Sequence, residues 1–315
     1  LRSVLARRYG MPVESFLCGS TVGDMIRAVA QTYQPCTVGV ATPGPVEYAL
    51  AAGNAGHQVV EILSPSGFVV PDPQAAARHG ISFDAAVLAN PGYPTSRLLP
   101  QPTLLHYLET CAWVVVDERS IELTLGGESM VPLTRDHRNL VVVRSLCESF
   151  AMPGVPVSYC VAHPDTIAQI GQWAENVYFG KPCGLMDQMA SSVGNIITID
   201  FASPAKPVVE PVAVDFSKAG LALCILDSGA DHADLTDEYA AIPAECRAVA
   251  AVCGGEVLRD VPFETFLAKL PECRRQCGDR AVLRAFHVYA DNDRVAKQVA
   301  ALHDGDYDTF LCLVN

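Results

Sequence analysis

The first half of the chain repeats a pattern of short apolar runs and helical segments, and this pattern constrains the fold more than any other feature. Apolar residues recur with helical spacing near residues 21–33 and 44–55. The apolar runs are CTVGVA at 36–41, QVVEIL at 58–63, FDAAVLAN at 83–90 and AWVVVDE at 112–118. They do not alternate regularly with polar residues, which favours strands that are buried on both faces. The sequence therefore predicts a parallel sheet with helices on both faces, an α/β domain.

The texture of the sequence changes after about residue 165. An amphipathic segment, IAQIGQWAEN, leads into a loop with Gly and Pro and then into the Met-rich segment MDQMASSVG. Two strand patterns follow, NIITIDF and ALCILDS, and the remainder has helical periodicity. A chain of 315 residues has room for two domains of ordinary size. We therefore expect an α/β domain over residues 1–165 and an α+β domain over residues 166–315.

Charge and hydropathy argue against two classes of partner. The formal net charge is −13 and no stripe of Lys and Arg with interleaved aromatic residues offsets it, so nucleic acid is not an expected partner. No run approaches the roughly 20 uncharged apolar residues that cross a bilayer. The first residues, LRSVLARRYG, also lack a signal-peptide core. We therefore expect a soluble, cytoplasmic protein without a membrane partner.

The chain has 12 cysteines, scattered at irregular spacings through apolar segments, which favours buried free thiols over disulfides. Cys273 and Cys277 lie four residues apart on an expected helix and could bridge a metal ion. A structural zinc site needs about four ligands, and no second pair or nearby ligand histidine accompanies them. Buried thiols are therefore the preferred interpretation of this pair as well.

Three segments of the first half resemble a known family. NLVVVRSLCESFAMPGVPVSYCVAHP resembles the Schiff-base segment of fold-type I pyridoxal-phosphate (PLP) enzymes, near histidinol-phosphate aminotransferase and threonine-phosphate decarboxylase. ANPGYPTSRLLP resembles the NPNNPTG turn of that family, and WVVVDE resembles the strand whose aspartate pairs with the pyridinium nitrogen. The resemblance implies a partial PLP-transferase-like domain over residues 1–165, with Asp117 as the pyridinium partner. From the residues alone, a strand-end carboxylate that caps the next segment explains Asp117 equally well.

The cofactor-binding residues of that family are altered in this chain. Glu148 stands where the lysine of the internal aldimine is expected, and a carboxylate cannot condense with an aldehyde. The first lysine anywhere in the sequence is Lys181. Pro156 replaces the family's phosphate-contacting arginine, and Tyr93 replaces the asparagine that contacts the phenolic oxygen of the cofactor. We therefore expect no covalently bound PLP.

The second half resembles a different family, the galactokinases of the GHMP small-molecule kinases. AENVYFGKPCGLMDQMASSVG carries the resemblance most strongly. Collinear support comes from DHADLTDEYAAIPAECRAVA, GGEVLRDV, GDRAVLRAFHVYADNDRV and ALHDGDYDTFLCLVN. So long a collinear set is more specific than any single motif. It implies a partial GHMP-kinase-like domain over about residues 166–315, with galactose, ATP and Mg²⁺ as its ligands.

The kinase resemblance gives roles to three residues. Asp187 in MDQ matches the general base that takes the proton from the sugar hydroxyl as it attacks the γ-phosphate. Glu175 in AEN matches the residue that binds the catalytic Mg²⁺, and Tyr239 in DEYAAIP matches a tyrosine that contacts the sugar. Without the resemblance, Asp187 would be a helix N-cap or first-turn residue, Glu175 a solvated helix charge and Tyr239 a half-buried packing residue.

Three segments that the family uses in catalysis are not found in the sequence. They are the sugar-binding segment of the GRVNLIGEHTDY type, the ATP loop rich in glycine and serine, and the late segment of the GGGFGGC type. The ATP loop holds triphosphate charge on backbone N–H groups at a helix N-terminus. We therefore expect no turnover by the chain alone, and a kinase reaction only where a longer chain or a partner supplies these segments.

Three functional hypotheses follow. The first is a galactokinase-type sugar kinase with a sugar and a nucleotide as ligands. The second is a non-catalytic composite or fusion that acts at most as a binding module, and the third is a relic of a PLP-dependent aminotransferase or decarboxylase. Because each half lacks elements that would cover its neighbours, both should expose apolar surface or sheet edges. We expect either that the halves cover each other or that the chain self-associates.

Overall fold

The computed structural model describes residues 1–64, 67–152, 154–180, 183–203, 207–224, 226 and 236–314. The chain divides into two compact units. The first unit comprises Leu1–Phe179 and Gly184–Gly194, and the second comprises Gly180–Cys183 and Asn195–Asn315.

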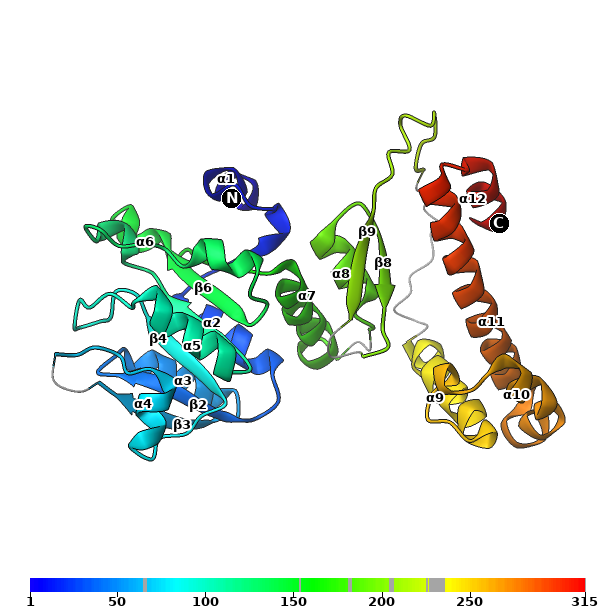
Figure 1. The fold of residues 1–315 in the computed structure, drawn as a ribbon, viewed down its shortest axis with the longest axis horizontal. Helices are drawn as coiled ribbons and strands as arrows, with labels where there is room; N and C mark the ends of the chain where they lie inside the picture. The colour runs from blue at the N-terminus through cyan, green and yellow to red at the C-terminus, as the bar shows by residue number, and fades with distance from the viewer. Residues whose placement is uncertain are drawn as a thin grey trace. The chain divides into compact units, whose positions relative to one another are not determined.

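The first unit is built around a seven-stranded sheet with the strand order β1-β7-β6-β5-β4-β2-β3. Figure 1 labels β2, β3, β4 and β6 of this sheet. Neighbouring strands from β3 to β6 run parallel, whereas β7 runs antiparallel to both β6 and β1. The expected parallel sheet is confirmed for the four predicted strands, which are β2 to β5. The apolar pattern did not predict the antiparallel edge formed by β1 and β7. Because of this edge, the sheet is mostly and not entirely parallel. The strands are β1 (Phe16–Gly19), β2 (Thr37–Thr42), β3 (Gln58–Leu63), β4 (Ala85–Ala89), β5 (Val114–Asp117), β6 (Leu140–Ser145) and β7 (Ser158–Ala162).

Helices bury both faces of this sheet, which explains why its strands are continuously apolar. Val115 of β5 belongs to a buried cluster with residues of α2, α3 and α7. Its neighbours Val114 and Val116 belong to the cluster on the other face, with residues of α1 and α5. Successive residues of one strand are thus buried by different helices. The helices are α1 (Arg2–Tyr9), α2 (Val22–Thr32), α3 (Val46–Asn54), α4 (Pro73–Arg78), α5 (Gln101–Thr110), α6 (Leu146–Ser149) and α7 (Pro164–Trp173), with the 3-10 turns η1 (Val13–Ser15), η2 (Ile121–Leu123) and η3 (Val131–Arg135).

Local sequence signals begin two of these helices. The Oγ1 of Thr21 accepts a hydrogen bond from the backbone N–H of Asp24 at 3.1 Å and caps α2. The Oδ1 of Asp72 accepts from the backbone N–H of Ala75 at 2.7 Å and caps α4, which starts with a proline. Each cap satisfies a backbone donor that the first helical turn leaves without a partner.

The first unit ends with a packed helix pair. After α7 come the π-helical turn η4 (Ala174–Tyr178) and α8 (Met186–Val193). α7 contributes Ile167 and Ile170 to the cluster that it shares with α2 and α3, and α8 packs against α7. The domain boundary expected at residues 165 and 166 stays a prediction. The compact units divide near residue 194. The reason is that α7 packs against α2 and β1 of the first unit, and α8 packs against α7.

The second unit combines a hairpin with helices. Strands β8 (Ile196–Asp200) and β9 (Val208–Val212) pair antiparallel. The core lies among α9, α10 and α11, where the side chain of Phe266 is fully buried. Gly278 interrupts α11 with φ 83° and ψ 165°, a conformation that glycine adopts without strain. The helical elements are α9 (Thr236–Cys253), η6 (Leu258–Asp260), α10 (Phe263–Ala268), α11 (Leu270–Asp304) and α12 (Tyr307–Val314).

Two strand predictions for this half have different outcomes. The strand expected in NIITIDF forms as β8, and the helical remainder is confirmed. In ALCILDS, the described residues 222–224 and 226 do not form a strand, and the others lie outside the described residues. The kinase-like fold of this unit therefore stays a prediction. Among the described helices, none is both long enough and apolar enough to cross a bilayer.

Candidate functional site

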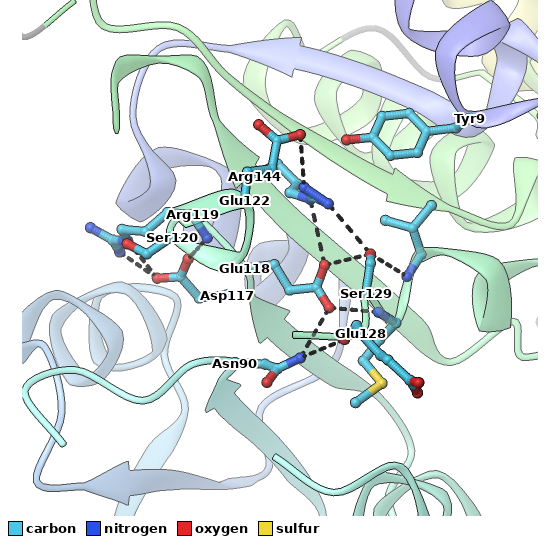
Figure 2. Close-up of polar contacts among 12 residues, drawn as sticks. Tyr9, Asn90, Asp117, Glu118, Arg119, Ser120, Glu122, Glu128, Ser129 and Arg144 are labelled. Atoms are coloured by element: carbon cyan, nitrogen blue, oxygen red, sulfur yellow. Dashed lines mark hydrogen bonds and ion pairs between the residues drawn. The ribbon is translucent and has the colours of Figure 1, made fainter. Parts of the chain in front are cut away.

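Polar side chains gather where the parallel strands of the first unit end. Asn90 follows β4, Asp117 ends β5 and Ser145 ends β6. All three are buried, with exposed fractions of 0%, 2% and 4%. In parallel α/β sheets, ligands bind at the carboxyl ends of the strands. This edge, part of which Figure 2 shows, is therefore the first candidate site.

Asp117 is held by contacts within the protein. The hydroxyl of Tyr48 on α3 donates to its Oδ2 at 2.5 Å. Arg119 donates from its backbone N–H to Oδ1 at 2.9 Å and from Nε to Oδ2 at 2.7 Å, and its guanidinium also pairs with Glu47. Burial, and then the charge of Asp117, raise the pKa of Tyr48 well above its usual range, so the phenol remains a donor. Both oxygens of Asp117 are engaged, as expected of a strand-end carboxylate.

The neighbouring Glu118 is the centre of a buried polar network (Figure 2). Its side chain is 0% exposed. Its Oε1 accepts from the backbone N–H of Met130 at 2.6 Å and from Nδ2 of Asn90 at 3.4 Å. Its Oε2 accepts from the hydroxyl of Ser129 at 2.7 Å and forms an ion pair with Nε of Arg144 at 3.4 Å. Burial raises the pKa of Glu118, and these partners offset part of the rise.

Arg144 extends this network to the first helix. Its Cζ lies 5.4 Å from the centre of the Tyr9 ring, within the range of a cation–π contact. Its Nη1 forms an ion pair with Glu122 at 3.4 Å, and Glu122 pairs with Arg8 of α1 at 2.8 Å. The network therefore ties α1, β6 and the segment after β5 together, and its role is to position them.

Sequence analysis did not single out Glu118 and Arg144. Their positions in the sequence could have identified them as buried charges, because Glu118 directly follows the apolar run VVVD and Arg144 interrupts the apolar run LVVVRS. A charge within a strand that is buried on both faces needs a partner. The sequence does not identify the partner, because Glu118 follows β5 and Arg144 lies on the neighbouring strand β6.

Glu148, at the expected lysine position, lies in α6 directly after β6. The Oγ of Ser145 accepts from the backbone N–H of Cys147 at 3.1 Å and caps this short helix. The Oε2 of Glu148 is buried and makes no hydrogen bond with any described residue. Tyr93 and Pro156, which replace two other cofactor contacts, are exposed.

These residues do not fit a covalently held PLP. Glu148 offers no amine, and its carboxylate would repel an anionic phosphate nearby. Asp117 already accepts three hydrogen bonds, one from the hydroxyl of Tyr48 and two from Arg119.

Two of the kinase-derived residues lie in the helix pair of the first unit. Asp187 is the second residue of α8 and is exposed to solvent. Glu175 is partly buried in the π-helical turn η4, a kind of turn that occurs frequently at functional sites. Among the described residues, neither carboxylate forms an ion pair. Asp187 is therefore accessible to a ligand and Glu175 is partly so, and their catalytic roles stay predictions.

Tyr239 lies in the second unit, near the beginning of α9, and is 50% exposed. This exposure is what a half-buried packing residue shows, and it also leaves part of the phenol accessible. Asp187 and Glu175 belong to the other unit, so a single site formed by all three residues stays a prediction.

The structure also bears on the metal and thiol predictions. Over the part of the chain that is described, no group of three or more His, Cys, Asp or Glu side chains is arranged to hold a metal ion. Magnesium is usually held by one or two carboxylates together with nucleotide phosphates, so the assignment of Glu175 stays a prediction. All 12 cysteines are free thiols. The expectation that they are buried is confirmed for Cys111, Cys160, Cys253 and Cys273. Six others, Cys277 among them, are only partly buried, and the expectation is wrong for Cys224 and Cys312, which are exposed.

Comparisons with known proteins agree with the aminotransferase resemblance of the first half. The profile of the family "aminotransferase class I and II" matches residues 73–197, which extends past the expected boundary at 165. A protein of Erwinia carotovora atroseptica, described provisionally as a histidinol-phosphate aminotransferase, superposes with a TM-score of 0.50 at 23% identity, covering 55% of this chain and 53% of that one. The L-threonine-O-3-phosphate decarboxylase of Porphyromonas gingivalis gives a TM-score of 0.48 at 22% identity, covering 61% of this chain and 59% of that one. The Erwinia likeness shows the fold alone.

Curated relatives agree with the second resemblance. Galactokinase from Actinobacillus pleuropneumoniae is 36% identical over 143 residues, which cover 44% of this chain and 35% of that protein. Galactokinase from Mannheimia succiniciproducens is 38% identical over 204 residues, which cover 61% of this chain and 49% of that protein. The chain thus spans between about a third and a half of the length of these relatives. The chain is similar to the class I and II aminotransferases over one part of its length and to galactokinases over part of its length.

Proposed function

We propose that this chain carries the base-bearing segment of a galactokinase-type sugar kinase, joined to an aminotransferase-like unit that acts as a scaffold. The observation that supports the proposal most is the exposed carboxylate of Asp187. It lies in a segment, CGLMDQ, that resembles galactokinases and in the first turn of a helix that packs against α7. The identity of 36% to 38% with galactokinases supports the substrate class.

In the proposed reaction, Asp187 accepts the proton of a galactose hydroxyl as that oxygen attacks the γ-phosphate of ATP. Glu175 holds Mg²⁺ together with phosphate oxygens, and Tyr239 contacts the sugar. Phosphoryl transfer depends almost wholly on positioning and on charge stabilisation. Because the sequence contains neither the sugar-binding segment nor the ATP loop of the family type, we propose that Asp187 and Tyr239 contribute part of the sugar contacts and that rapid turnover needs the additional segments. Such a reaction belongs to the cytoplasm, where free thiols also stay reduced.

The test compares Asp187→Ala with a matched control. Asp308 is also an exposed aspartate and is also the second residue of an eight-residue helix, α12, so Asp308→Ala controls for loss of a first-turn charge. Galactose binding to the chain with Mg²⁺ and a non-hydrolysable ATP analogue is measured by calorimetry, and galactose-dependent ADP release is measured in parallel. We expect Asp187→Ala to weaken galactose binding and to remove any galactose-dependent ADP release, and Asp308→Ala to leave both unchanged. Absence of galactose binding in all three proteins, with equal background ADP release, would refute the kinase proposal.

A second candidate function, the non-catalytic binding module, is favoured by a specific surface. Val177, Tyr178 and Phe179 are consecutive and expose 62%, 77% and 74% of their side chains. Large apolar side chains in such a run are typical of a surface that a partner covers. Sedimentation of the wild type beside a Val177→Ser/Tyr178→Ser/Phe179→Ser variant tests for self-association. A concentration-dependent oligomer that the variant loses supports this function, and a monomer at every concentration counts against it.

A further inference from the structure

Two cysteines meet in the core of the second unit. Cys253 is the last residue of α9 and Cys273 lies in the first turns of α11. Their sulfur atoms are 3.7 Å apart, and the residues are 20 positions apart in the sequence. Both are buried, with exposed fractions of 9% and 0%. Sulfur atoms in contact need only side-chain rotation and a small shift of the helix ends to reach the S–S bond length of about 2 Å.

The surroundings hold this pair in register. Nζ of Lys269, which directly precedes α11, donates to the carbonyl oxygen of Val252 at 3.0 Å, so a second contact joins the same two helix ends. Cys246 and Cys277 pack against the same core, but each is only partly buried. In the described residues these thiols do not form part of a metal-binding group. The contact is therefore between two free thiols.

A route for a reagent exists at the end of α9. Gly254 follows Cys253 with φ +94°, so the helix stops at the cysteine itself. Helix ends open more readily than helix centres. Burial raises the pKa of the Cys273 thiol to about 11, so this thiol is protonated while the core is closed. Reaction is expected to begin at Cys253, at the edge of the core, when the helix end opens.

We propose that Cys253 and Cys273 form a reversible disulfide that clamps α9 to α11 when the chain meets a low-molecular-weight disulfide such as oxidised glutathione. The Cys253 thiolate attacks one sulfur of the oxidant, forming a mixed disulfide and releasing one glutathione thiolate. The Cys273 thiolate then attacks the Cys253 sulfur and releases the second glutathione. The two protein thiols lose two electrons and two protons, and oxidised glutathione gains both as two thiols. This clamp does not depend on the kinase proposal.

The disulfide would add a covalent link to an interface between α9 and α11 that ion pairs already stabilise. Arg284 of α11 pairs with Glu245 of α9 at 2.7 Å and with Glu238 at 3.1 Å. These ion pairs are at least partly exposed and weaken with salt. A covalent bond between the same helices does not weaken with salt. The oxidised second unit should therefore keep a higher midpoint of thermal unfolding in high salt than the reduced one.

The experiment uses the full chain with its exposed cysteines removed by Cys224→Ala and Cys312→Ala, so that they cannot react with the oxidant. The protein is equilibrated with reduced and oxidised glutathione, blocked with a maleimide and mapped by mass spectrometry. We expect a peptide pair linked through Cys253 and Cys273, lighter by two hydrogens and separated by dithiothreitol. We also expect a higher midpoint of thermal unfolding for the oxidised chain.

Two controls keep the result specific. Cys253→Ala should remove both the linked pair and the rise in midpoint, whereas Cys277→Ala should leave both in place. If Cys253→Ala fails to fold, the peptide map of the unaltered pair still decides the question. Only glutathione adducts, a link through Cys246 or Cys277, or no change at ratios that oxidise exposed dithiols would overturn the proposal.

Discussion

Replacing Arg144 with methionine tests whether the buried network around Glu118 holds the first unit together. Methionine keeps much of the apolar stem but removes the charge that lies 3.4 Å from the Glu118 carboxylate. Unit charges at this separation attract by about 5 kcal/mol at an effective dielectric constant of about 20. In the variant, Glu118 can bind a proton, because burial already raises its pKa, and the loss of a buried charge offsets part of this lost attraction. We therefore expect the free energy of unfolding to fall by about 3 kcal/mol near pH 8.

The direction of the pH dependence follows from the raised pKa. A carboxyl group whose pKa is higher in the folded than in the unfolded protein stabilises the fold below the unfolded value. That stability is lost as pH rises through the folded value. Arg144→Met raises the pKa of Glu118 further, so the loss should shrink between about pH 8 and about pH 6. Adding Glu118→Gln, which cannot ionise, should recover most of the loss near pH 8 and remove its pH dependence.

The assay is urea unfolding followed by tryptophan fluorescence. Both tryptophans, Trp113 and Trp173, lie in the first unit, so the signal reports on that unit. Arg135→Met is the control, because Arg135 is exposed and donates to the backbone of Gly10 at 2.6 Å. It should cost less than about 1 kcal/mol. The reasoning fails if Arg144→Met costs no more than this control, or costs the same at both pH values.

Three further outcomes are expected. Tyr48→Phe removes the donor to buried Asp117 and should cost about 1.5–3 kcal/mol in urea unfolding; a cost below 0.5 kcal/mol would mean that water replaces the hydroxyl. Glu148→Lys restores an amine but, after free PLP is removed, should retain no more borohydride-reducible PLP than the wild type, because Tyr93 and Pro156 still stand where two other cofactor contacts are expected; an excess retained on the introduced lysine would show a usable cofactor site. Gly278→Ala should lower the midpoint of thermal unfolding, because alanine at this positive φ is strained by about 1 kcal/mol or more. Replacing a glycine of helical conformation with alanine should not lower it. An unchanged midpoint in Gly278→Ala would mean that α11 straightens without strain.

The central strands could be predicted because burial on both faces leaves a local trace in the sequence. Val114, Val115 and Val116 face alternate helix layers, and each layer demands an apolar residue. The antiparallel edge was not predicted, because β1 is four residues long and only its first residue is fully buried. Strand direction also leaves no mark on such short runs.

The candidate site could be predicted only in part, because its contacts are long-range. Asp117 was singled out as a strand-end carboxylate, yet its partner Tyr48 is 69 positions away. Glu118, directly after β5, meets Arg144 of the neighbouring strand β6, and the periodicity of either segment does not identify the other. For Asp187 and Glu175 the sequence predicts roles, and the structure gives their positions and accessibility.

Because α7 is packed on both sides, the segment that joins the two regions of resemblance is part of the folded core of the first unit and is not a linker. Its buried face, with Ile167 and Ile170, completes the covering of the sheet, while the sequence that follows leads directly to Asp187. A cut at residue 165 would remove α7 from the sheet that it covers and would expose the apolar face of α7 on the fragment that carries α8. Substitutions on the buried face of α7 are therefore constrained by packing against the sheet. Substitutions in α8, which α7 supports, are constrained by the role of Asp187. The two regions of resemblance therefore cannot be separated at residue 165 without exposing apolar surface on both fragments.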